Sequence, residues 1–227
     1  MKLSILMPAH NEESTIAEAI RRIRAVPLDL EREIVVVNDA STDTTPEILA
    51  TLSGDDLVVL HHPKNRGKGA ALRTGLGRCT GDLILIHDAD LEYYPEDIPK
   101  LLDMQRTEQA DVVYGSRFLG EITGMRGINR LANVGLAWAT TLLYGQRITD
   151  EATAYKLFRA DLLKSLPLRC ERFEFCPEVT ARILRSGVRI AETPIRYCGR
   201  TTEEGKKIGW RDGVEAFTTL LRYRVLK

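Results

Sequence analysis

The chain has 227 residues, of which 44% are hydrophobic and 28% are charged. These proportions are typical of a soluble globular protein and exclude collagenous, low-complexity and disordered chains. The 32 basic residues balance the 32 acidic ones, whereas a duplex-binding protein normally carries an excess of positive charge. We therefore expect one domain over residues 1–227 and no nucleic-acid partner.

Neither the start of the chain nor its apolar stretches predict an export signal or a membrane span. Residues 1–8 carry one Lys and a very short apolar run, unlike a signal peptide. The longest uncharged stretch, residues 131–146, is shorter than the roughly 18–20 apolar residues of a span. The 4 cysteines suit neither a zinc site nor a disulfide framework. We expect a cytoplasmic protein.

Short apolar runs alternate with helical patterns in the first half of the chain. The runs are continuous, as expected of strands covered on both faces. They occupy residues 3–7, 34–37, 57–60, 83–86 and 112–114. The helical patterns are a stripe over 16–23 capped by Asn11, followed by 45–52, 69–78 and 95–104. This alternation predicts an α/β fold, with a mostly parallel central sheet and helices on both faces.

Beyond Arg117 the pattern is less regular. We expect helices at 129–144, 177–185 and 210–226, and strands at 155–158 and 188–194. Residues 200–209 form a charged loop, which is either simply solvated or a lid that closes over a bound ligand.

Acidic and polar residues follow three of the predicted strands, at 8–12, 38–43 and 87–92. In open α/β sheets, ligands bind at the carboxyl ends of the strands. Asp88 and Asp90 are the sharpest feature, because two carboxylates separated by one residue can present oxygens to one Mg²⁺. A solvated turn is the alternative. No phosphate-cradling G-x-x-x-x-G-K-[ST] motif occurs, and Leu72 replaces the third glycine of a dinucleotide fingerprint.

Four motifs occur in the order and spacing of a known family. They are Pro8-Ala9-x-Asn11-Glu12, Asp39-x-Ser41-x-Asp43, Asn65-x-Gly67-Lys68-Gly69-Ala70-Ala71 and Asp88-Ala89-Asp90-Leu91. Together with Gly115-Ser116-Arg117-Phe118 and Tyr155-Lys156-Leu157-Phe158, they cover nearly the whole chain. The chain resembles inverting glycosyltransferases of the GT-A fold, family 2. Within that family it is most similar to the dolichyl-phosphate mannose synthases and their bacterial polyprenyl-phosphate relatives.

The resemblance implies a nucleotide-binding half over 1–116 and an acceptor-binding half over 117–227. It implies a nucleotide pocket formed by Pro8, Ala9, Asn11, Glu12, Asp39 and Lys68. Glu12 would reach the ribose or base, and Asp39 would accept hydrogen bonds from the base. Asp88 and Asp90 would orient Mg²⁺ or Mn²⁺ on the diphosphate. Glu92, where many relatives carry Gln, would be a further metal ligand.

A nucleoside diphosphate leaving group needs its developing charge neutralised by the cation and by basic side chains. The candidates for diphosphate or acceptor-phosphate contact are Arg117, Arg200, Lys206 and Lys207. The resemblance thus makes Asp88, Asp90, Arg117 and Arg200 the catalytic residues. A phosphate acceptor is already dianionic at neutral pH, since its second pKa is about 6, and needs no base. For a sugar hydroxyl, Asp150 or Glu178 is the candidate base, unless these acids only cap helices or form ion pairs.

Two predicted helices are candidates for binding a membrane that contains the lipid acceptor. The helix at 129–144 is apolar around much of its circumference, with Arg126, Arg130 and Arg147 nearby. The last helix has an apolar stripe at Trp210, Val214, Phe217, Leu221 and Val225. Interfacial helices would place the protein peripherally on the cytoplasmic face of a membrane, but ordinary core helices explain the same residues.

From the resemblance we expect a metal-dependent inverting transferase that moves a hexose to a polyprenyl phosphate. GDP-mannose is the preferred donor, with a UDP-hexose close behind. The alternatives are a UDP-sugar transferase with a saccharide hydroxyl acceptor and a non-catalytic nucleotide-sugar-binding subunit. The missing Q-x-x-R-W motif before Trp210 disfavours a polymerising enzyme, and the intact acids disfavour a non-catalytic subunit. A membrane protein that receives the product is left open.

Overall fold

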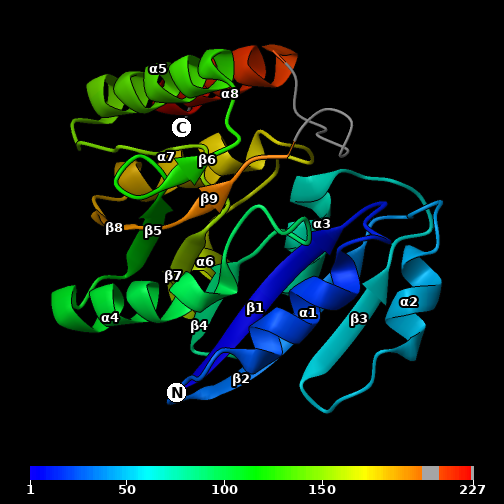
Figure 1. The fold of residues 1–227 in the computed structure, drawn as a ribbon. Helices are drawn as coiled ribbons and strands as arrows, with labels where there is room; N and C mark the ends of the chain where they lie inside the picture. Colours follow the sequence, from blue (N-terminus) through cyan, green and yellow to red (C-terminus); the bar gives the residue numbers. More distant parts are fainter. Residues whose placement is uncertain (201–209, 226–227) are drawn as a thin grey trace.

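The computed structural model describes residues 1–200 and 210–225 (Figure 1). The strands are β1 Lys2–Ala9, β2 Glu31–Asn38, β3 Leu57–His61, β4 Leu83–Ile86, β5 Val112–Ser116, β6 Ile122–Thr123, β7 Lys156–Arg159, β8 Ile190–Pro194 and β9 Tyr197–Cys198. The helices are α1 Ile16–Ala25, α2 Thr45–Thr51, α3 Lys68–Leu76, the 3₁₀ turn η1 Pro95–Asp97, α4 Ile98–Glu108, α5 Gly127–Tyr144, α6 Ala160–Ser165, α7 Phe175–Arg185 and α8 Trp210–Val225.

The main sheet has the strand order β3-β2-β1-β4-β7-β5-β8. The four strands from β3 to β4 are parallel, and β5 is parallel to β8. β7 is antiparallel to both of its neighbours, β4 and β5, so these two run in the same direction. The small strands β6 and β9 form a separate parallel pair. The α/β class and the mostly parallel sheet are therefore confirmed.

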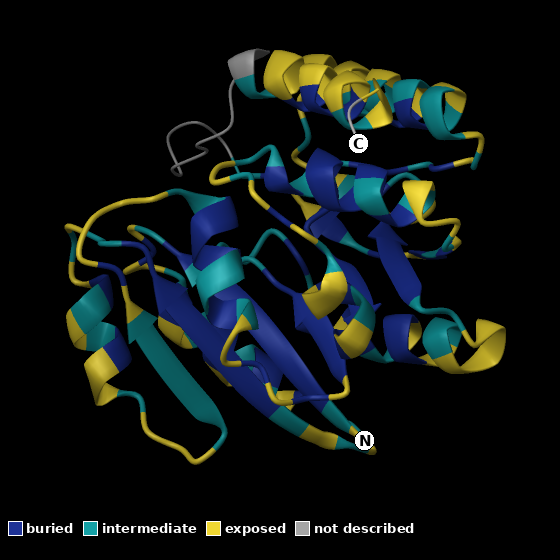
Figure 2. Ribbon diagram, turned by 180° about the vertical axis from the view of Figure 1, so that it is seen from behind, coloured by how far each residue is buried: buried dark blue, intermediate teal, exposed yellow. Residues whose placement is uncertain are grey.

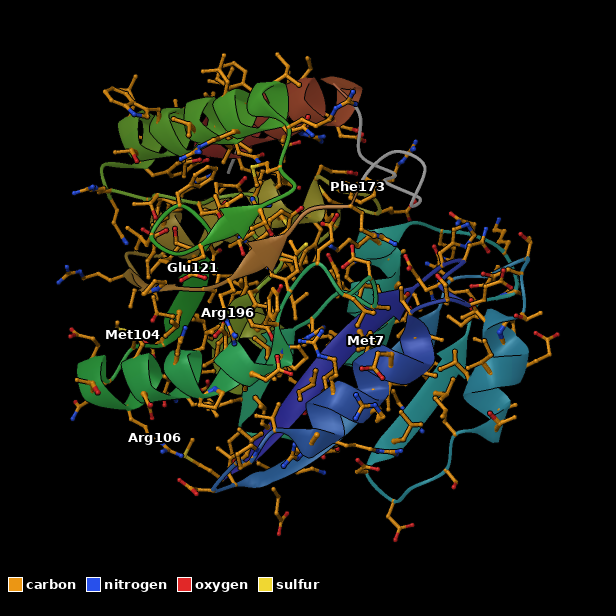
Figure 3. The ribbon with its side chains drawn as sticks, viewed as in Figure 1. Met7, Met104, Arg106, Glu121, Phe173 and Arg196 are labelled. Atoms are coloured by element: carbon orange, nitrogen blue, oxygen red, sulfur yellow. The ribbon has the colours of Figure 1, made fainter. Side chains whose placement is uncertain are left out.

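Two hydrophobic layers cover the sheet, because side chains alternate along each strand. On β1, Leu3, Ile5 and Met7 enter the layer that contains α1, α2 and α4. Leu6 enters the opposite layer, which contains α3, α6 and α7. Figure 2 shows the central strands buried between these layers, and Figure 3 labels Met7 on β1. Helices lie on both faces, as predicted.

The structure differs from the sequence prediction in several local details. Asn11 is not the cap of α1, which begins at Ile16 after Thr15. The Glu12 carbonyl accepts hydrogen bonds from the amides of Thr15 and Ile16, so a turn separates Asn11 from the helix. The sequence analysis also missed α6, β6 and β9. The two strands are only two residues long and depend on each other for pairing.

The helices α5 and α8 lie together at one end of the molecule, with α8 packed against both α5 and α7 (Figure 1). On α5, Trp138 is 75% exposed and Leu142 is 85% exposed, while Ala137 and Thr140 are buried. On α8, the predicted stripe from Val214 to Val225 is likewise exposed. These are not ordinary core helices. Within the described residues, no helix combines the length and apolarity that a membrane crossing needs.

Candidate active site

Three loops leave the adjacent strands β2, β1 and β4 at one edge of the sheet, and each holds a non-glycine residue with positive φ. Asn11 has φ 53°, Ala40 has φ 54° and Leu91 has φ 59°. Such backbone costs on the order of 1 kcal/mol or more and persists only where the surroundings hold it. The Asn11 side-chain oxygen accepts a hydrogen bond from the Thr42 backbone amide at 2.8 Å, and the Asn11 backbone amide donates to Ser41 Oγ at 2.9 Å. The first two loops thus brace each other at the predicted ligand-binding edge.

Four carboxylates gather at this edge, and we call them the acid group: Glu12, Asp88, Asp90 and Glu92. Arg200 contacts three of them. Its Nη1 lies 3.2 Å from a Glu12 oxygen, its Nη2 lies 3.0 Å from an Asp90 oxygen, and its amide donates to Glu92 at 2.8 Å. Lys68, the first residue of α3, donates from Nζ to Asp88 at 2.7 Å. The structure thus brings two of the predicted basic residues, Lys68 and Arg200, together with all four acids.

The electrostatics of the acid group reflect crowding of like charges. Burial raises the pKa of Asp90, and the neighbouring charges of Asp88 and Glu92 raise it further, while Arg200 opposes them. Burial alone would lower the pKa of Lys68, but Asp88 outweighs it, so the pKa of Lys68 is raised. A carboxylate whose ionised form is disfavoured in this way gains from a bound divalent cation.

The oxygen donors of Asp88 and Asp90 fit a hard cation such as Mg²⁺ or Mn²⁺. Glu92 does not form a third ligand beside them. One of its oxygens accepts from the Tyr197 hydroxyl at 2.6 Å, and the other accepts from the Arg200 amide. In the part of the chain that the structure describes, no three acidic, histidine or cysteine side chains converge to hold a metal ion. This geometry favours Asp88 and Asp90 over a three-carboxylate site, and metal binding by these acids stays a prediction.

Asp39 is buried and supports the loop that leads into α3. One carboxylate oxygen accepts from the Arg66 amide at 2.9 Å and lies 2.6 Å from His62 Nδ1. The other accepts from the Gly67 amide at 2.7 Å. Asp39 therefore positions the segment before Lys68, which the sequence analysis did not anticipate. Its hydrogen bond to a nucleotide base stays a prediction.

Arg117 and Asp150 form a buried ion pair. The Nε and Nη2 of Arg117 donate to the two Asp150 oxygens at 2.7 Å each. Burial lowers the pKa of Arg117, but the Asp150 charge outweighs it and holds the pKa well above its usual range. The guanidinium also lies 5.0 Å from the centre of the Tyr197 ring, which separates it from Glu92. Asp150 therefore forms the ion pair that the sequence left open as the alternative, its role as a base stays a prediction, and Arg117 lies one ring away from the acid group.

Glu178, the other candidate base, is buried on α7 and supports its own surroundings. It accepts hydrogen bonds from the amides of Arg169 and Cys170, from Arg182 and from the Tyr223 hydroxyl. Burial raises the pKa of Glu178, but these donors outweigh it and leave the pKa below its usual value. None of these contacts reaches the acid group, so Glu178 has the structural contacts that the sequence left open as the alternative, and its role as a base stays a prediction.

Tyr197 is the site residue that the sequence analysis missed. It donates to Glu92, lies under the Arg117 guanidinium and packs edge-on against Tyr93 at 5.3 Å. Glu92 and Tyr197 are 105 positions apart, and no local motif marks their meeting. Of the charged loop or lid predicted at 200–209, only Arg200 lies within the described residues, so Lys206 and Lys207 lie outside them.

The sequence matches the model of Glycosyl transferase family 2 over residues 4–166. It is 34% identical to the low-salt glycan biosynthesis hexosyltransferase Agl6 of Haloferax volcanii over 92% of this chain, and it spans only 51% of that relative. It is 33% identical to the undecaprenyl-phosphate mannosyltransferase of Micrococcus luteus, over 98% of this chain and 94% of that protein. The structure resembles glucosyl-3-phosphoglycerate synthase from Mycobacterium tuberculosis in complex with Mn²⁺, uridine diphosphate and phosphoglyceric acid, with a TM-score of 0.75 and 24% identity over 100% of this chain and 79% of that one.

These matches agree with the order of the motifs along the chain and with the parallel strands that carry the acid group. The similarity in structure shows the GT-A fold, and the sequence matches show the family. The chain belongs to glycosyl transferase family 2 and is a glycosyltransferase.

Proposed function

We propose that this glycosyltransferase moves a hexose from a nucleotide diphosphate sugar to a polyprenyl phosphate, with inversion at the anomeric carbon. The observation that carries the proposal is the acid group, with Lys68 and Arg200 on it, at the carboxyl edge of β1 and β4. A divalent cation held by Asp88 and Asp90 would supply Lewis-acid stabilisation of the leaving diphosphate. Such an edge suits a ligand that carries both phosphate charge and a bound cation.

The basic residues have a second role once a donor is bound. Lys68 and Arg200 hold the acids in the structure described here, and the same cations stabilise the charge that develops on a leaving diphosphate. Arg200 suits a bidentate phosphate contact, whereas Lys68 acts as a point charge. Arg117 uses Nε and Nη2 on Asp150 and has Nη1 left for an acceptor phosphate.

A phosphate acceptor agrees with the state of the two candidate bases. Asp150 and Glu178 are both buried and hydrogen-bonded, so neither is placed to take a proton from a sugar hydroxyl. A phosphate monoester is already a dianion at neutral pH and attacks the anomeric carbon without a base. In-line attack in a single displacement inverts that carbon. The relative from Micrococcus luteus, by its name, uses undecaprenyl phosphate.

For the donor we propose GDP-mannose first and a UDP-hexose second. The nucleotide would lie over residues 1–116, against the loop from Pro8 to Glu12 and beside Asp39, and the acceptor over 117–227. Mannose rests on the name of the Micrococcus luteus relative, whereas the solved Mycobacterium tuberculosis structure holds uridine diphosphate. Asp39, as an acceptor-only group, serves guanine or uracil.

We further propose peripheral binding to the cytoplasmic face of a membrane through α5 and α8. Trp138 and Leu142 on α5 and Val225 on α8 are exposed, and Arg222 and Arg224 lie nearby in sequence on the last turn of α8. Apolar and aromatic side chains flanked by basic ones favour an anionic lipid surface. This surface would bring the acceptor lipid to the enzyme. An integral membrane protein that takes the product is a further proposed partner.

The deciding experiment offers radiolabelled GDP-mannose and UDP-glucose to the purified chain, each with and without polyprenyl phosphate and Mn²⁺. We expect label in the lipid fraction only when donor, lipid phosphate and metal are all present. In a parallel reaction with an added saccharide, label on the saccharide and none on lipid would identify the hydroxyl-acceptor alternative. Donor binding without any product, across acceptors, would identify a non-catalytic subunit.

A further inference from the structure

A charged cavity lies away from the acid group, between the segment that precedes α7 and the end of α8. Its volume is about 460 Å³. We call it the arginine pocket, and its lining residues are Pro167, Arg169, Cys170, Glu171, Arg172, Glu174, Arg182, Arg222 and Tyr223. No member of the acid group lines it.

The charges of the lining residues do not cancel. Arg182 is paired with Glu178 at 2.9 Å, and Glu171 lies 3.4 Å from Arg73, which is not part of the lining. The remaining charged residues are three arginines and one acid: Arg169, Arg172 and Arg222 against Glu174. Within residues 1–200 and 210–225, none of these three guanidinium groups forms a hydrogen bond or ion pair. The pocket therefore holds two surplus positive charges.

The pocket is built on a fixed base. The Tyr223 hydroxyl donates to Glu178 at 2.7 Å, and the Arg182 guanidinium lies 4.5 Å from the centre of the Tyr223 ring. Glu178 also accepts from the amides of Arg169 and Cys170, which holds the segment that bears two of the unpaired arginines. The side chains at the bottom of the pocket are hydrogen-bonded within the protein, whereas the three guanidinium groups above them have no partner among the described residues. That contrast indicates a site for an external anion.

The same segment packs on the start of α3. The carbonyl oxygens of Glu171 and Arg172 accept from the amides of Ala70 and Gly69 at 2.9 and 3.2 Å. A Cβ atom at Gly67 would lie 2.5 Å from the Glu171 oxygen, so this approach requires glycine. Figure 3 shows Phe173, from the same segment, beside α3. Main-chain oxygens of the segment thus face α3, while its side chains line the arginine pocket.

We propose that the arginine pocket binds a dianionic phosphate group, carried either by a soluble phosphate ester or by an anionic lipid head group. Guanidinium groups form bidentate hydrogen bonds with phosphate oxygens, and such charge-assisted hydrogen bonds are stronger than those between neutral groups. A phosphate monoester above its second pKa of about 6 carries the two negative charges that the surplus requires. The volume also leaves space for an organic group beside the phosphate.

The test is calorimetric titration of inorganic pyrophosphate into the full chain with EDTA present, so that no divalent cation links the probe to Asp88 and Asp90. The double variant Arg172→Ala/Arg222→Ala removes two exposed guanidinium groups, and Arg78→Ala, an exposed arginine beyond α3, is the matched control. We expect wild type and the control to bind alike and the double variant to bind at least about tenfold more weakly. Because all three positions are exposed, the variants should unfold at the same temperature as wild type. The affinities of the single variants Arg172→Ala and Arg222→Ala for pyrophosphate give a second measurement.

A vesicle arm separates the two sources of phosphate. Phosphatidylcholine vesicles with and without phosphatidic acid are sedimented with each variant, with and without pyrophosphate. If a lipid head group is the natural ligand, pyrophosphate and the double variant both reduce sedimentation with phosphatidic acid. If the ligand is soluble, pyrophosphate changes the calorimetry but not the sedimentation of wild type, and any loss of sedimentation in the double variant comes from Arg222 on the proposed membrane-binding helix α8. Equal behaviour of wild type and double variant in both arms, or no binding by wild type in either, overturns the proposal, and neither result depends on sugar transfer.

Discussion

Two regions of the molecule invert the usual distribution of polarity. At the carboxyl edge of β1, β2 and β4, charged groups are buried, and Asp39 and Glu12 are each less than a tenth exposed. On α5 and α8, large apolar side chains such as Trp138 and Leu142 face outward. Burying charge and exposing apolar surface are both unfavourable for an isolated chain. We therefore expect both regions to bind a partner, a charged ligand at the edge and an apolar surface at the helices.

Asp90 at the edge differs from an acid that the fold satisfies by itself. Glu33 on β2 accepts from Ser4 and from the amide and hydroxyl of Thr80, and it lies 2.6 Å from Lys2. Burial alone would raise the pKa of Glu33, but these donors lower it to about 2. The pKa of Asp90 is raised instead. The fold therefore stabilises the ionised form of Glu33 and disfavours the ionised form of Asp90.

The largest effect is expected from Asp90→Asn. Removing this charge should reduce turnover by about a thousandfold or more, because a cation held by Asp88 and Asp90 would lose one of its two protein ligands. The free energy of unfolding should stay the same or rise above neutral pH, since ionised Asp90 is disfavoured in the folded protein. Transfer to lipid, Mn²⁺ affinity and thermal unfolding are measured together. Asp103→Asn, at an exposed position on α4, is the control, and normal turnover in D90N would end the metal assignment.

The next effect is expected from Asp150→Asn, which leaves the Arg117 guanidinium buried without its countercharge. Breaking a buried ion pair in this way costs about 3–5 kcal/mol of unfolding free energy. Urea denaturation gives the value, and Asp161→Asn, an acid exposed on α6, is a control of the same chemistry. If D150N unfolds like wild type yet loses activity only with hydroxyl acceptors, Asp150 is a base after all.

Features that depend on neighbouring residues could be predicted from the sequence, whereas contacts between residues far apart in the sequence could not. The strands, the parallel sheet and the acids after β4 could be predicted, because continuous apolar runs and the residues that follow them are local features of the sequence. The Arg117–Asp150 pair could not, since its members are 33 positions apart and each on its own suits a catalytic role. Tyr197 reaches Glu92 only because β9 folds back beside the loop after β4. Patterns mark which residues carry chemistry, but their partners are decided by tertiary packing.

A smaller effect, on vesicle binding, is expected from removing exposed apolar side chains of α5. The double variant Trp138→Ser/Leu142→Ser removes exposed apolar area from α5, and its binding to anionic vesicles should weaken about tenfold or more. Its unfolding free energy should change by less than about 0.5 kcal/mol, because neither side chain is part of the core. Leu119→Ser, an exposed apolar position outside both helices, is the control. Unchanged sedimentation of the double variant would show that this face does not bind membranes.

The smallest effect is expected from Glu33→Gln and depends on pH. The folded pKa of Glu33, about 2, lies below its ordinary value of 4.5, so the ionised carboxylate stabilises the folded protein. This contribution is fully present above pH 4.5 and is lost as the pH falls through 2. We expect E33Q to cost about 1–2 kcal/mol at pH 7 and progressively less between pH 4 and 2. Denaturant unfolding across this range measures the difference, with Glu31→Gln, an exposed acid on the same strand, as the control. If the unfolding free energy lost in E33Q does not shrink at low pH, Glu33 acts through its shape and hydrogen bonds. The contrast between Glu33 and Asp90 would then not be one of charge.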